Sequence, residues 1–270
     1  MNKKTLLIGC VIFVLYIIIA IAAPVIVPHD PIRDRVQPHV PPSATHILGT
    51  NDIGGDIFSE LLIGTRQSLL IGFTAAVISL IIGVLFGVMA GWFGGWLDEC
   101  LTAITSLCIT IPFFPLVIVI SALVRGGSLT PAVILGLLSW PETARILRSQ
   151  TIAIRERQYI QDIRAMGAGS YYTLTRHVLR ALVPMAAYRF ILAFRAGVLA
   201  ETTLSFLGLG SPQVISWGNM LYFAQARNAF LTGQWLWWVL PPGIALMGLV
   251  FALLLVSYYF EQAADPGLER

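Results

Sequence analysis

Long apolar runs alternate with short polar segments along this chain, and the pattern predicts a bundle of membrane-spanning helices. A bilayer core of about 30 Å needs about 20 apolar residues of helix. The runs that meet this length are residues 5–27, 68–90, 99–123, 130–148, 182–204 and 236–260. Pro112 and Pro115 interrupt the third run and predict a kink in it. The expected fold is therefore all-α, a polytopic membrane protein with six transmembrane helices.

We expect two parts in the chain. Residues 1–67 would form an N-terminal anchor helix followed by an external segment, and residues 68–270 a five-helix core with a polar loop at 149–180. The first apolar run exceeds the 7–15 residues of a signal-peptide core, so it predicts a retained anchor.

Lysine and arginine positions predict the orientation of the helices. With the N-terminus in the cytoplasm, the inside segments hold ten positive residues and the outside segments five. Because cytoplasmic loops carry the excess of positive charge, both termini should be cytoplasmic. The inside set is Lys3, Lys4, Arg145, Arg148, Arg155, Arg157, Arg164, Arg176, Arg180 and Arg270. The outside set is Arg33, Arg35, Arg66, Arg125 and Arg227.

Composition supports a membrane protein and excludes several other classes. Hydrophobic residues make up 57% of the chain and charged residues 11%, whereas soluble domains carry roughly 25% charged residues. The net charge of +3 gives no reason to expect a nucleic-acid partner. Lysine occurs only at Lys3 and Lys4, so the chain cannot contain the lysine-bearing phosphate loop of an ATPase. Any ATP hydrolysis must take place on another polypeptide.

The remaining polar chemistry is sparse. Cys10, Cys100 and Cys108 lie in or beside apolar runs and predict packing residues rather than a disulfide framework. Three histidines, His29, His39 and His46, lie in the external segment. Imidazole suits nickel or zinc, but the spacing matches no tight chelate, so we expect solvated loop residues and no metal site.

The polar loop predicts two helices separated by a glycine turn. Residues 149–166 lack Pro and Gly and should be helical. Ile160, Ile163 and Met166 make a narrow apolar stripe on that helix. Gly167 and Gly169 should end it, before a second helix at 171–180. This arrangement suits insertion into a groove on a partner protein, with contact to anionic lipid as the alternative.

Charged residues inside the fifth run are unusual for a membrane helix. Arg189 lies roughly 10 Å from the cytoplasmic start and Arg195 about 20 Å in, at 1.5 Å per residue. Intramembrane ionisable residues are candidates for a solute pathway. We therefore assign Arg189 and Arg195 to the translocation pathway, where Arg195 would favour an anionic group. The alternative is a structural bond to a partner or to backbone carbonyls.

The polar loop resembles the cytoplasmic signature of binding-protein-dependent ABC importer permeases. That signature is Glu-Ala-Ala, three residues and Gly, and here the positions are Gln161, Asp162, Ile163 and Gly167. Only the glycine matches, so the way the loop contacts its partner differs in detail.

Other stretches resemble one branch of these permeases, the dipeptide/oligopeptide/nickel family. They are Leu48 to Ser59, Gly64 to Leu70, Ile111-Pro112, Ser139-Trp140, Ala144-Arg145, Leu204 to Gly210, Ser216 to Leu221, Pro242-Gly243 and Asp265-Pro266. The match covers nearly the whole chain in order. It departs from the family at Gly55, where an Arg is usual, and at Arg180 and Ala181, where Pro-Asn is common.

The resemblance implies a type I ABC importer permease fold, the second and shorter permease of a pair. Its partners would be a second homologous permease chain, two ATP-binding subunits that carry ATP and Mg²⁺, and an extracytoplasmic solute-binding protein. This chain would bind no cofactor itself and would lie in a bacterial inner membrane. The residues that would contact the ATPase are Arg157, Tyr159, Gln161, Asp162, Ile163, Arg164 and Gly167. The residues that would order the external face are Asp52, Asp56, Glu201, Gly208 and Trp217.

Two cargoes remain open within this family, peptides and nickel or a metal–chelator complex. The external histidines favour metal weakly. A membrane-embedded enzyme is a remote alternative, because the chain has no HExxH or GxSxG motif.

Overall fold

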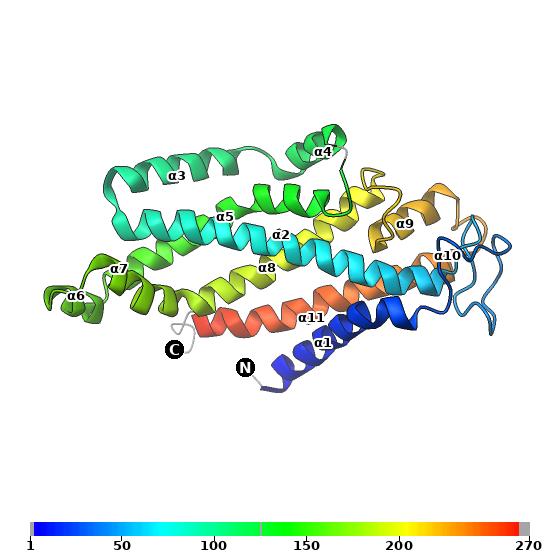
Figure 1. The fold of residues 1–270 in the computed structure, drawn as a ribbon, viewed down its shortest axis with the longest axis horizontal. Helices are drawn as coiled ribbons and strands as arrows, with labels where there is room; N and C mark the ends of the chain where they lie inside the picture. The colour runs from blue at the N-terminus through cyan, green and yellow to red at the C-terminus, as the bar shows by residue number, and fades with distance from the viewer. Residues whose placement is uncertain (1–2, 125, 265–270) are drawn as a thin grey trace. The chain divides into compact units, whose positions relative to one another are not determined.

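The computed structural model describes residues 3–124 and 126–264, mostly as helices (Figure 1). The long helices are α1 (Lys3–Ile26), α2 (Ile57–Phe93), α3 (Gly95–Thr110), α4 (Phe113–Leu123), α5 (Thr130–Arg155), α8 (Leu179–Phe206) and α11 (Leu240–Ala264). The short ones are α6 (Gln158–Ala165), α7 (Ser170–Thr173), the π-helix η1 (Leu174–Val178), α9 (Trp217–Ala226) and α10 (Trp235–Trp238). In the described ranges, β pairing is confined to a bridge between Thr50 and Asp56. Arg125, Arg270 and Asp265-Pro266, which we used above, lie outside these ranges.

The described helices include four that are long and apolar enough to cross a membrane, or five if a bent pair counts as one. The candidates are Thr5–Ile26, Ile57–Phe93, Ser170–Phe206 and Trp235–Glu261, together with the pair α3 and α4. The expected six-helix count is thus not reached by length and composition. The missing span is residues 130–148, which lie in α5, where Glu142, Arg145 and Arg148 lower the hydropathy.

The kink expected at Pro112 is confirmed. Helices α3 and α4 are bent by 82° at the short break between them. Proline removes a backbone donor and clashes with the preceding turn, and Ile111 before it takes an extended conformation at φ −78° and ψ 125°. The same physical rule that predicts the interruption explains its position.

The expected helix boundaries differ from the structure at two places. Helix α2 begins at Ile57 rather than at residue 68, because Asp56 accepts hydrogen bonds from the backbone and hydroxyl of Ser59. The helix expected at 149–166 is divided, since α5 ends at Arg155 and Arg157 is extended at φ −65° and ψ 138° before α6. The helix expected at 171–180 does not end there, because α7 and η1 continue directly into α8.

The chain forms two compact units. Unit 1 comprises residues 1–73, 121–132 and 195–256, and unit 2 comprises residues 74–120, 133–194 and 257–270. Helices α2, α4, α5, α8 and α11 contribute residues to both.

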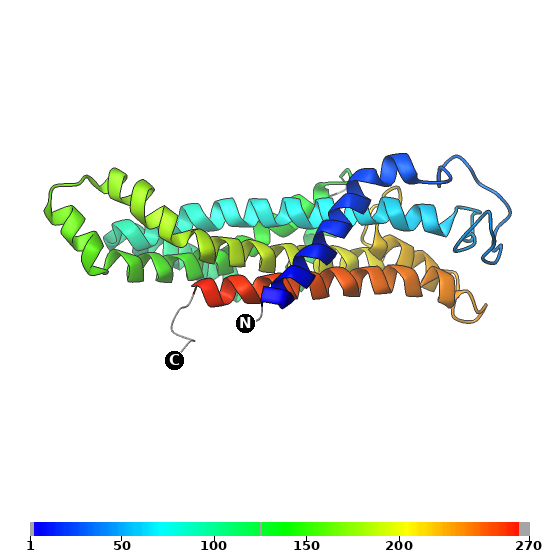
Figure 2. The ribbon, with the colours of Figure 1, turned by 90° about the horizontal axis from the view of Figure 1, so that it is seen from below.

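Within unit 1, α1 packs across α11 (Figure 2). The hydroxyl of Tyr16 donates a hydrogen bond of 2.8 Å to the carbonyl oxygen of Ala245. The Tyr16 ring also meets the Trp217 ring edge-on, with centroids 6.0 Å apart. A polar contact and an aromatic contact therefore tie the N-terminal helix to the elements beside it.

Within unit 2, a row of small residues brings α2 and α5 into backbone contact. Gly83, Gly87 and Gly91 recur at four-residue spacing on α2. A Cβ at Gly87 would lie 2.4 Å from the carbonyl oxygen of Ala144 on α5, which is closer than any real contact. Small residues at such positions let membrane helices approach closely. An apolar core lies next to this row and is centred on Trp92, Leu147 and Ile154. Residues of α2, α5, α6, η1 and α8 contribute to it.

Candidate functional site

The segment that carries α6 is held to unit 2 by one buried side chain. Ile160 is fully buried and belongs to the apolar core of this unit. Its neighbours there are Val88, Trp92, Leu147, Ile154, Val178 and Leu182. The position of α6 is therefore set by a contact shared with α2, α5, η1 and α8.

The other side chains of this segment are largely exposed. The apolar stripe expected along it is divided, because Ile160 points inward, Ile163 is half-buried and Met166 is 79% exposed. The exposed members of the predicted ATPase-contact set are Arg157, Tyr159, Gln161, Asp162, Arg164 and Gly167. A partner would thus meet polar groups and aromatic rings more than an apolar stripe.

Two of the predicted contact residues are bonded inside their own segment. The side-chain amide of Gln158 donates to Asp162 Oδ1 at 2.8 Å, and that of Gln161 donates to the carbonyl oxygen of Glu156 at 3.3 Å. The Arg164 guanidinium lies 5.5 Å from the centroid of the Trp92 ring, within range of a cation–π interaction. Arg164 therefore reinforces the contact between α6 and α2.

A glycine closes α6 as expected. Gly167 has a φ of +92°, its N–H donates to the carbonyl oxygen of Arg164, and the N–H of Ala168 donates to that of Ile163. This pair of bonds is the Schellman motif, which needs a left-handed residue at the position of Gly167. Gly169 has an ordinary φ of −65°, so only the first of the two glycines is required by its conformation.

At unit 1, the predicted residues Asp52 and Asp56 have separate partners. Asp52 forms an ion pair with Arg227 at 2.8 Å. Asp56 is 2% exposed and accepts from the imidazole Nδ1 of His46 at 3.0 Å as well as from Ser59. Each carboxylate holds the polar segment 28–56 against a helix.

Glu201 joins the end of α8 to the start of α9. Its carboxylate Oε1 accepts from the hydroxyls of Ser205 and Ser216, each at 2.8 Å, and the side chain is 2% exposed. The Ser216 hydroxyl also accepts from the N–H of Asn219 and so caps α9. Glu201 therefore bonds residues on both sides of the loop between the two helices, and its role in ordering the external face stays a prediction.

The other two predicted external residues flank this loop. Gly208 turns the chain after α8 with a φ of +79°. Trp217 is fully buried, and its backbone N–H donates to the hydroxyl of Ser68 at 3.3 Å. The structure thus groups Glu201, Gly208 and Trp217 around the α8–α9 connection, apart from Asp52 and Asp56.

The two arginines of the fifth run differ in environment. Arg189 is 8% exposed in unit 2, with Nη2 3.6 Å from Glu142 Oε2 and 3.4 Å from the hydroxyl of Thr143. These contacts favour the structural alternative for Arg189. Arg195 belongs to unit 1 and is half-buried. Its assignment to a pathway stays a prediction.

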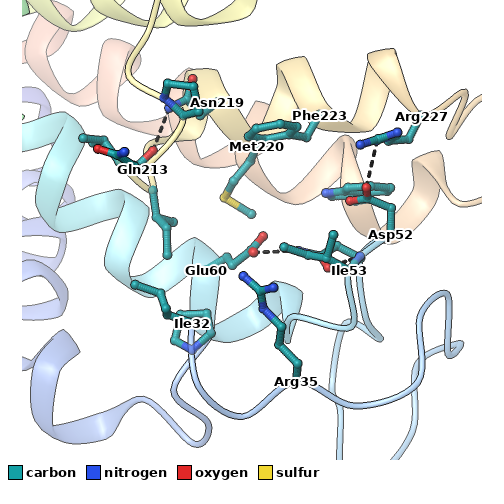
Figure 3. A pocket seen from close by; sticks show the side chains of 16 residues that line it. Ile32, Arg35, Asp52, Ile53, Glu60, Gln213, Asn219, Met220, Phe223 and Arg227 are labelled. Atoms are coloured by element: carbon teal, nitrogen blue, oxygen red, sulfur yellow. Dashed lines mark hydrogen bonds and ion pairs between the residues drawn. The ribbon is translucent and has the colours of Figure 1, made fainter.

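A cavity of about 410 Å³ in unit 1 was missed by sequence reasoning (Figure 3). The polar segment and α2 form one side, including Arg35 and Glu60, and the loop before α9 together with α9 forms the other, including Met220. Glu60 directly follows the motif Leu48 to Ser59, and this position was the available signal. The cavity residues opposite it, from Pro212 onward, are more than 150 residues away and could not be read from spacing.

The histidines of the segment 28–56 contact other residues of the protein. His39 Nδ1 lies 2.9 Å from Gln234 Oε1, and His29 Nε2 lies 3.0 Å from the carbonyl oxygen of Thr45. In the ranges that the structure describes, no three His, Cys, Asp or Glu residues converge in a way that could hold a metal ion.

Comparison with known proteins gives a consistent result. Residues 83–270 match the family described as binding-protein-dependent transport system inner membrane component, and residues 1–42 match the N-terminal TM domain of oligopeptide transport permease C. The chain is 31% identical, over its full length and 89% of the relative, to a Brucella suis protein named "Putative peptide permease protein". It is 30% identical, over its full length and 84% of the relative, to the dipeptide transport system permease protein DppC of Bacillus subtilis. The chain therefore belongs to the family of binding-protein-dependent transport system inner membrane components, the permeases of ABC transporters.

Proposed function

We propose that this chain is one of two permease subunits of an ABC importer that moves peptides across the inner membrane, driven by separate ATPase subunits. Relatives from two organisms are named for peptide or dipeptide transport. The N-terminal match to oligopeptide transport permease C supports the same cargo class. Peptides are therefore favoured over nickel.

In this assembly the second permease is a homologous chain, and an extracytoplasmic binding protein delivers the solute. Two ATP-binding subunits supply ATP and Mg²⁺. The chain crosses the membrane six times, with both termini in the cytoplasm, if the bent pair α3–α4 and the more polar α5 each count as a span. Residues 1–67 act as anchor and external segment and residues 68–270 as the permease core.

The observation that carries the coupling proposal is the contrast between buried Ile160 and its exposed neighbours. An ATPase that binds the exposed face of α6 would displace Ile160 and, because the core is close-packed, the parts of α2, α5 and α8 that it contacts. That is how a packed helix transmits a rocking motion. The coupling helix of this permease is accordingly α6 with the turn at Gly167.

Arg195 is proposed to line the solute pathway. It is half-buried within a membrane helix, and no ion pair with an acidic residue is found for it in the described ranges. An intramembrane charge without such a pair is a default candidate for solute contact. Replacement of Arg195 by Ala should change transport rate or substrate preference, and no change in either would remove the residue from the pathway.

The decisive experiment reconstitutes the complete transporter in proteoliposomes. Labelled dipeptides and oligopeptides would be offered in parallel with free and chelated nickel, with and without ATP. ATP-dependent peptide uptake is the expected result. Uptake of nickel alone would replace the cargo and keep the mechanism, and an intact complex that imports nothing would refute the proposed function.

Two glycine variants test the coupling turn within the same assay. An added Cβ meets nothing within 4 Å at either Gly167 or Gly169, but only Gly167 has a left-handed φ. Gly167→Ala should therefore strain the turn by about 1–2 kcal/mol and reduce ATP-coupled uptake, whereas Gly169→Ala should not. Equal uptake by the two variants would contradict a role for this turn.

A further inference from the structure

The cavity in unit 1 has features that the coupling mechanism does not use. Its two sides are joined at one edge by the ion pair between Asp52 and Arg227, whose side-chain atoms lie 2.8 Å apart. Its volume of about 410 Å³ lies within the range of small-molecule sites. Every residue that lines it belongs to unit 1.

Apolar side chains form most of the cavity wall. They come from both sides of the cavity: Pro31, Ile32, Ile53, Pro212, Val214, Ile215, Met220, Phe223 and Trp238. Such walls favour burial of aliphatic or aromatic groups. They do not by themselves select a ligand.

Two ionisable side chains that line the cavity narrow the choice of ligand, the half-buried Glu60 and the exposed Arg35. Figure 3 shows the Glu60 carboxylate between Arg35 and Met220. Its Oε1 accepts from the side-chain amide of Asn51 at 2.6 Å, and among the described residues no hydrogen bond to Oε2 is found. Arg35 lines the same cavity, and no carboxylate of the described ranges lies within ion-pair distance of it. The cavity therefore offers an acceptor and a donor that each have capacity for a further partner.

Acidic and basic side chains occur in equal number in the lining, since Asp52 and Glu60 are acids and Arg35 and Arg227 are bases. Glu60 is half-buried near Asp52 and Asp56, a setting in which a cationic partner would stabilise its ionised form. A single cation would pair with Glu60 alone, and a single anion would pair with the exposed Arg35 alone. A zwitterion would pair with both.

We propose that this cavity is a binding site for a short zwitterionic peptide with apolar side chains, its ammonium group on Glu60 and its carboxylate on Arg35. The proposal rests on the proposed function for the cargo class and adds a site on the permease itself. The apolar walls take the side chains, and charge-assisted hydrogen bonds orient the two termini.

The sequence origin of the lining residues agrees with this assignment. Arg35 and Ile32 lie in residues 1–42, which match the N-terminal domain of oligopeptide transport permease C, and Met220 lies in residues 83–270, which match the broader family. The cavity thus requires the N-terminal segment that marks the oligopeptide branch.

The test is equilibrium dialysis of the purified, assembled transporter without its binding protein, with labelled leucyl-leucine as the probe. N-acetyl-leucyl-leucine lacks the ammonium group, and leucyl-leucine amide lacks the carboxylate. Wild type should bind the free dipeptide about tenfold or more tightly than either derivative. Equal binding of all three, or no saturable binding, would overturn the proposal.

Substitutions in the cavity test whether the dipeptide binds there. Glu60→Gln keeps the size of the side chain and its bond to Asn51, and it should abolish the preference for the free over the acetylated dipeptide. Met220→Trp should fill the cavity and weaken binding of every probe. Arg33→Gln is the control, because Arg33 is exposed in the same segment and does not line the cavity. Unchanged discrimination in Glu60→Gln would place the dipeptide elsewhere and refute the assignment.

Uptake measured on the same preparations separates this proposal from the proposed function. A complex that imports peptides but binds no dipeptide by itself would refute the cavity and leave the function intact. A complex that binds the dipeptide in the cavity but imports only nickel would refute the function and leave the site. If Met220→Trp blocked docking of the binding protein without changing dipeptide binding, the cavity would hold a segment of that protein, and the proposal would be wrong.

Discussion

The segment 28–56, which we propose to be external, and the segment 156–178, which we propose to couple the permease to its ATPase, are both polar connections in a largely apolar chain, but different interactions order them. The external segment contains no helix and is held by side-chain hydrogen bonds to its own backbone. Asn51 Oδ1, for example, accepts from the N–H groups of Ile53 and Gly55. The coupling segment forms short helices and is anchored by the buried Ile160.

The difference fits the two roles proposed for these segments. A network of directional hydrogen bonds fixes a loop at many points and can shape a cavity with defined charge positions. A single apolar anchor fixes a helix at one point and leaves its outer face free for a partner. We therefore expect the external segment to respond to the loss of polar groups and the coupling segment to respond mainly to the loss of its anchor.

The largest effect should come from Ile160→Ala. Removing a fully buried isoleucine costs about 2–5 kcal/mol of unfolding free energy. The matched control is Met166→Ala, which alters a side chain that is 79% exposed and should change stability by less than about 0.5 kcal/mol. Thermal unfolding in detergent, followed by tryptophan fluorescence, compares the two variants. Equal midpoints would mean that α6 is not anchored as described.

In the external segment, the variant that corresponds to Ile160→Ala is Asp56→Ala. It removes the cap of α2 and the acceptor of His46, and we expect a loss of about 2–3 kcal/mol. Asp34→Ala, an exposed change in the same segment, should cost far less. Rates of proteolysis within residues 28–56 report the local effect. Equal rates in both variants would show that the network does not depend on Asp56.

A smaller loss of stability is expected at Arg164, where a charged side chain helps to hold α6 against α2. Arg164→Gln removes the cation–π contact with Trp92, which is worth about 0.5–1 kcal/mol at an exposed site. Arg157→Gln removes the same charge from the exposed residue before α6 and serves as the control. Hydrogen exchange of the α6 amides should increase only in the first variant, and an increase in both would assign the effect to net charge.

The smallest expected effect is a loss of stability of the external segment at acid pH. Hydrogen bonds from the backbone N–H groups of Ile32 and Arg33 hold the pKa of Asp30 below its usual value of 3.8. A lowered carboxyl pKa stabilises the fold above the unfolded pKa, and the contribution is lost as pH falls through the folded pKa. Cleavage of the external segment by an acid-active protease should therefore rise below about pH 3.8 in wild type and vary less with pH in Asp30→Asn. Identical pH profiles would exclude Asp30 as the source.

Sequence reasoning recovered the features that depend on local chemistry. The bend at Pro112 and the end of α6 at Gly167 follow from the steric limits of those residues. Five of the six expected runs lie in helices long and apolar enough to cross a membrane, if the bent pair counts as one, and the run 130–148 does not. Sequence reasoning missed the break at Arg157, because nothing in the residue types around it forbids a helix. After that break, Ile160 is buried in a core with residues of α2 and α8, a tertiary contact that sequence spacing does not reveal.

The candidate sites show the same limit. The motif around Asp52 and Asp56 was found, but Glu60 acquires its setting from α9, more than 150 residues later in the chain. The partner of Arg189, Glu142, is likewise remote in sequence. Convergence of distant segments is determined by packing, which hydropathy and spacing describe only as a set of helices.

The glycine row on α2 has a consequence for how the sequence can vary. Because α2 and α5 touch through backbone atoms at Gly87 and Gly91, this pair of helices tolerates no gradual enlargement of side chains along the seam. Saturation mutagenesis at Gly83, Gly87 and Gly91 should return a narrow spectrum of functional residues, while the lipid-exposed positions between them, such as Leu85, should accept most apolar residues. Every fourth position along this part of α2 would then reject substitutions, while the positions between them would accept many.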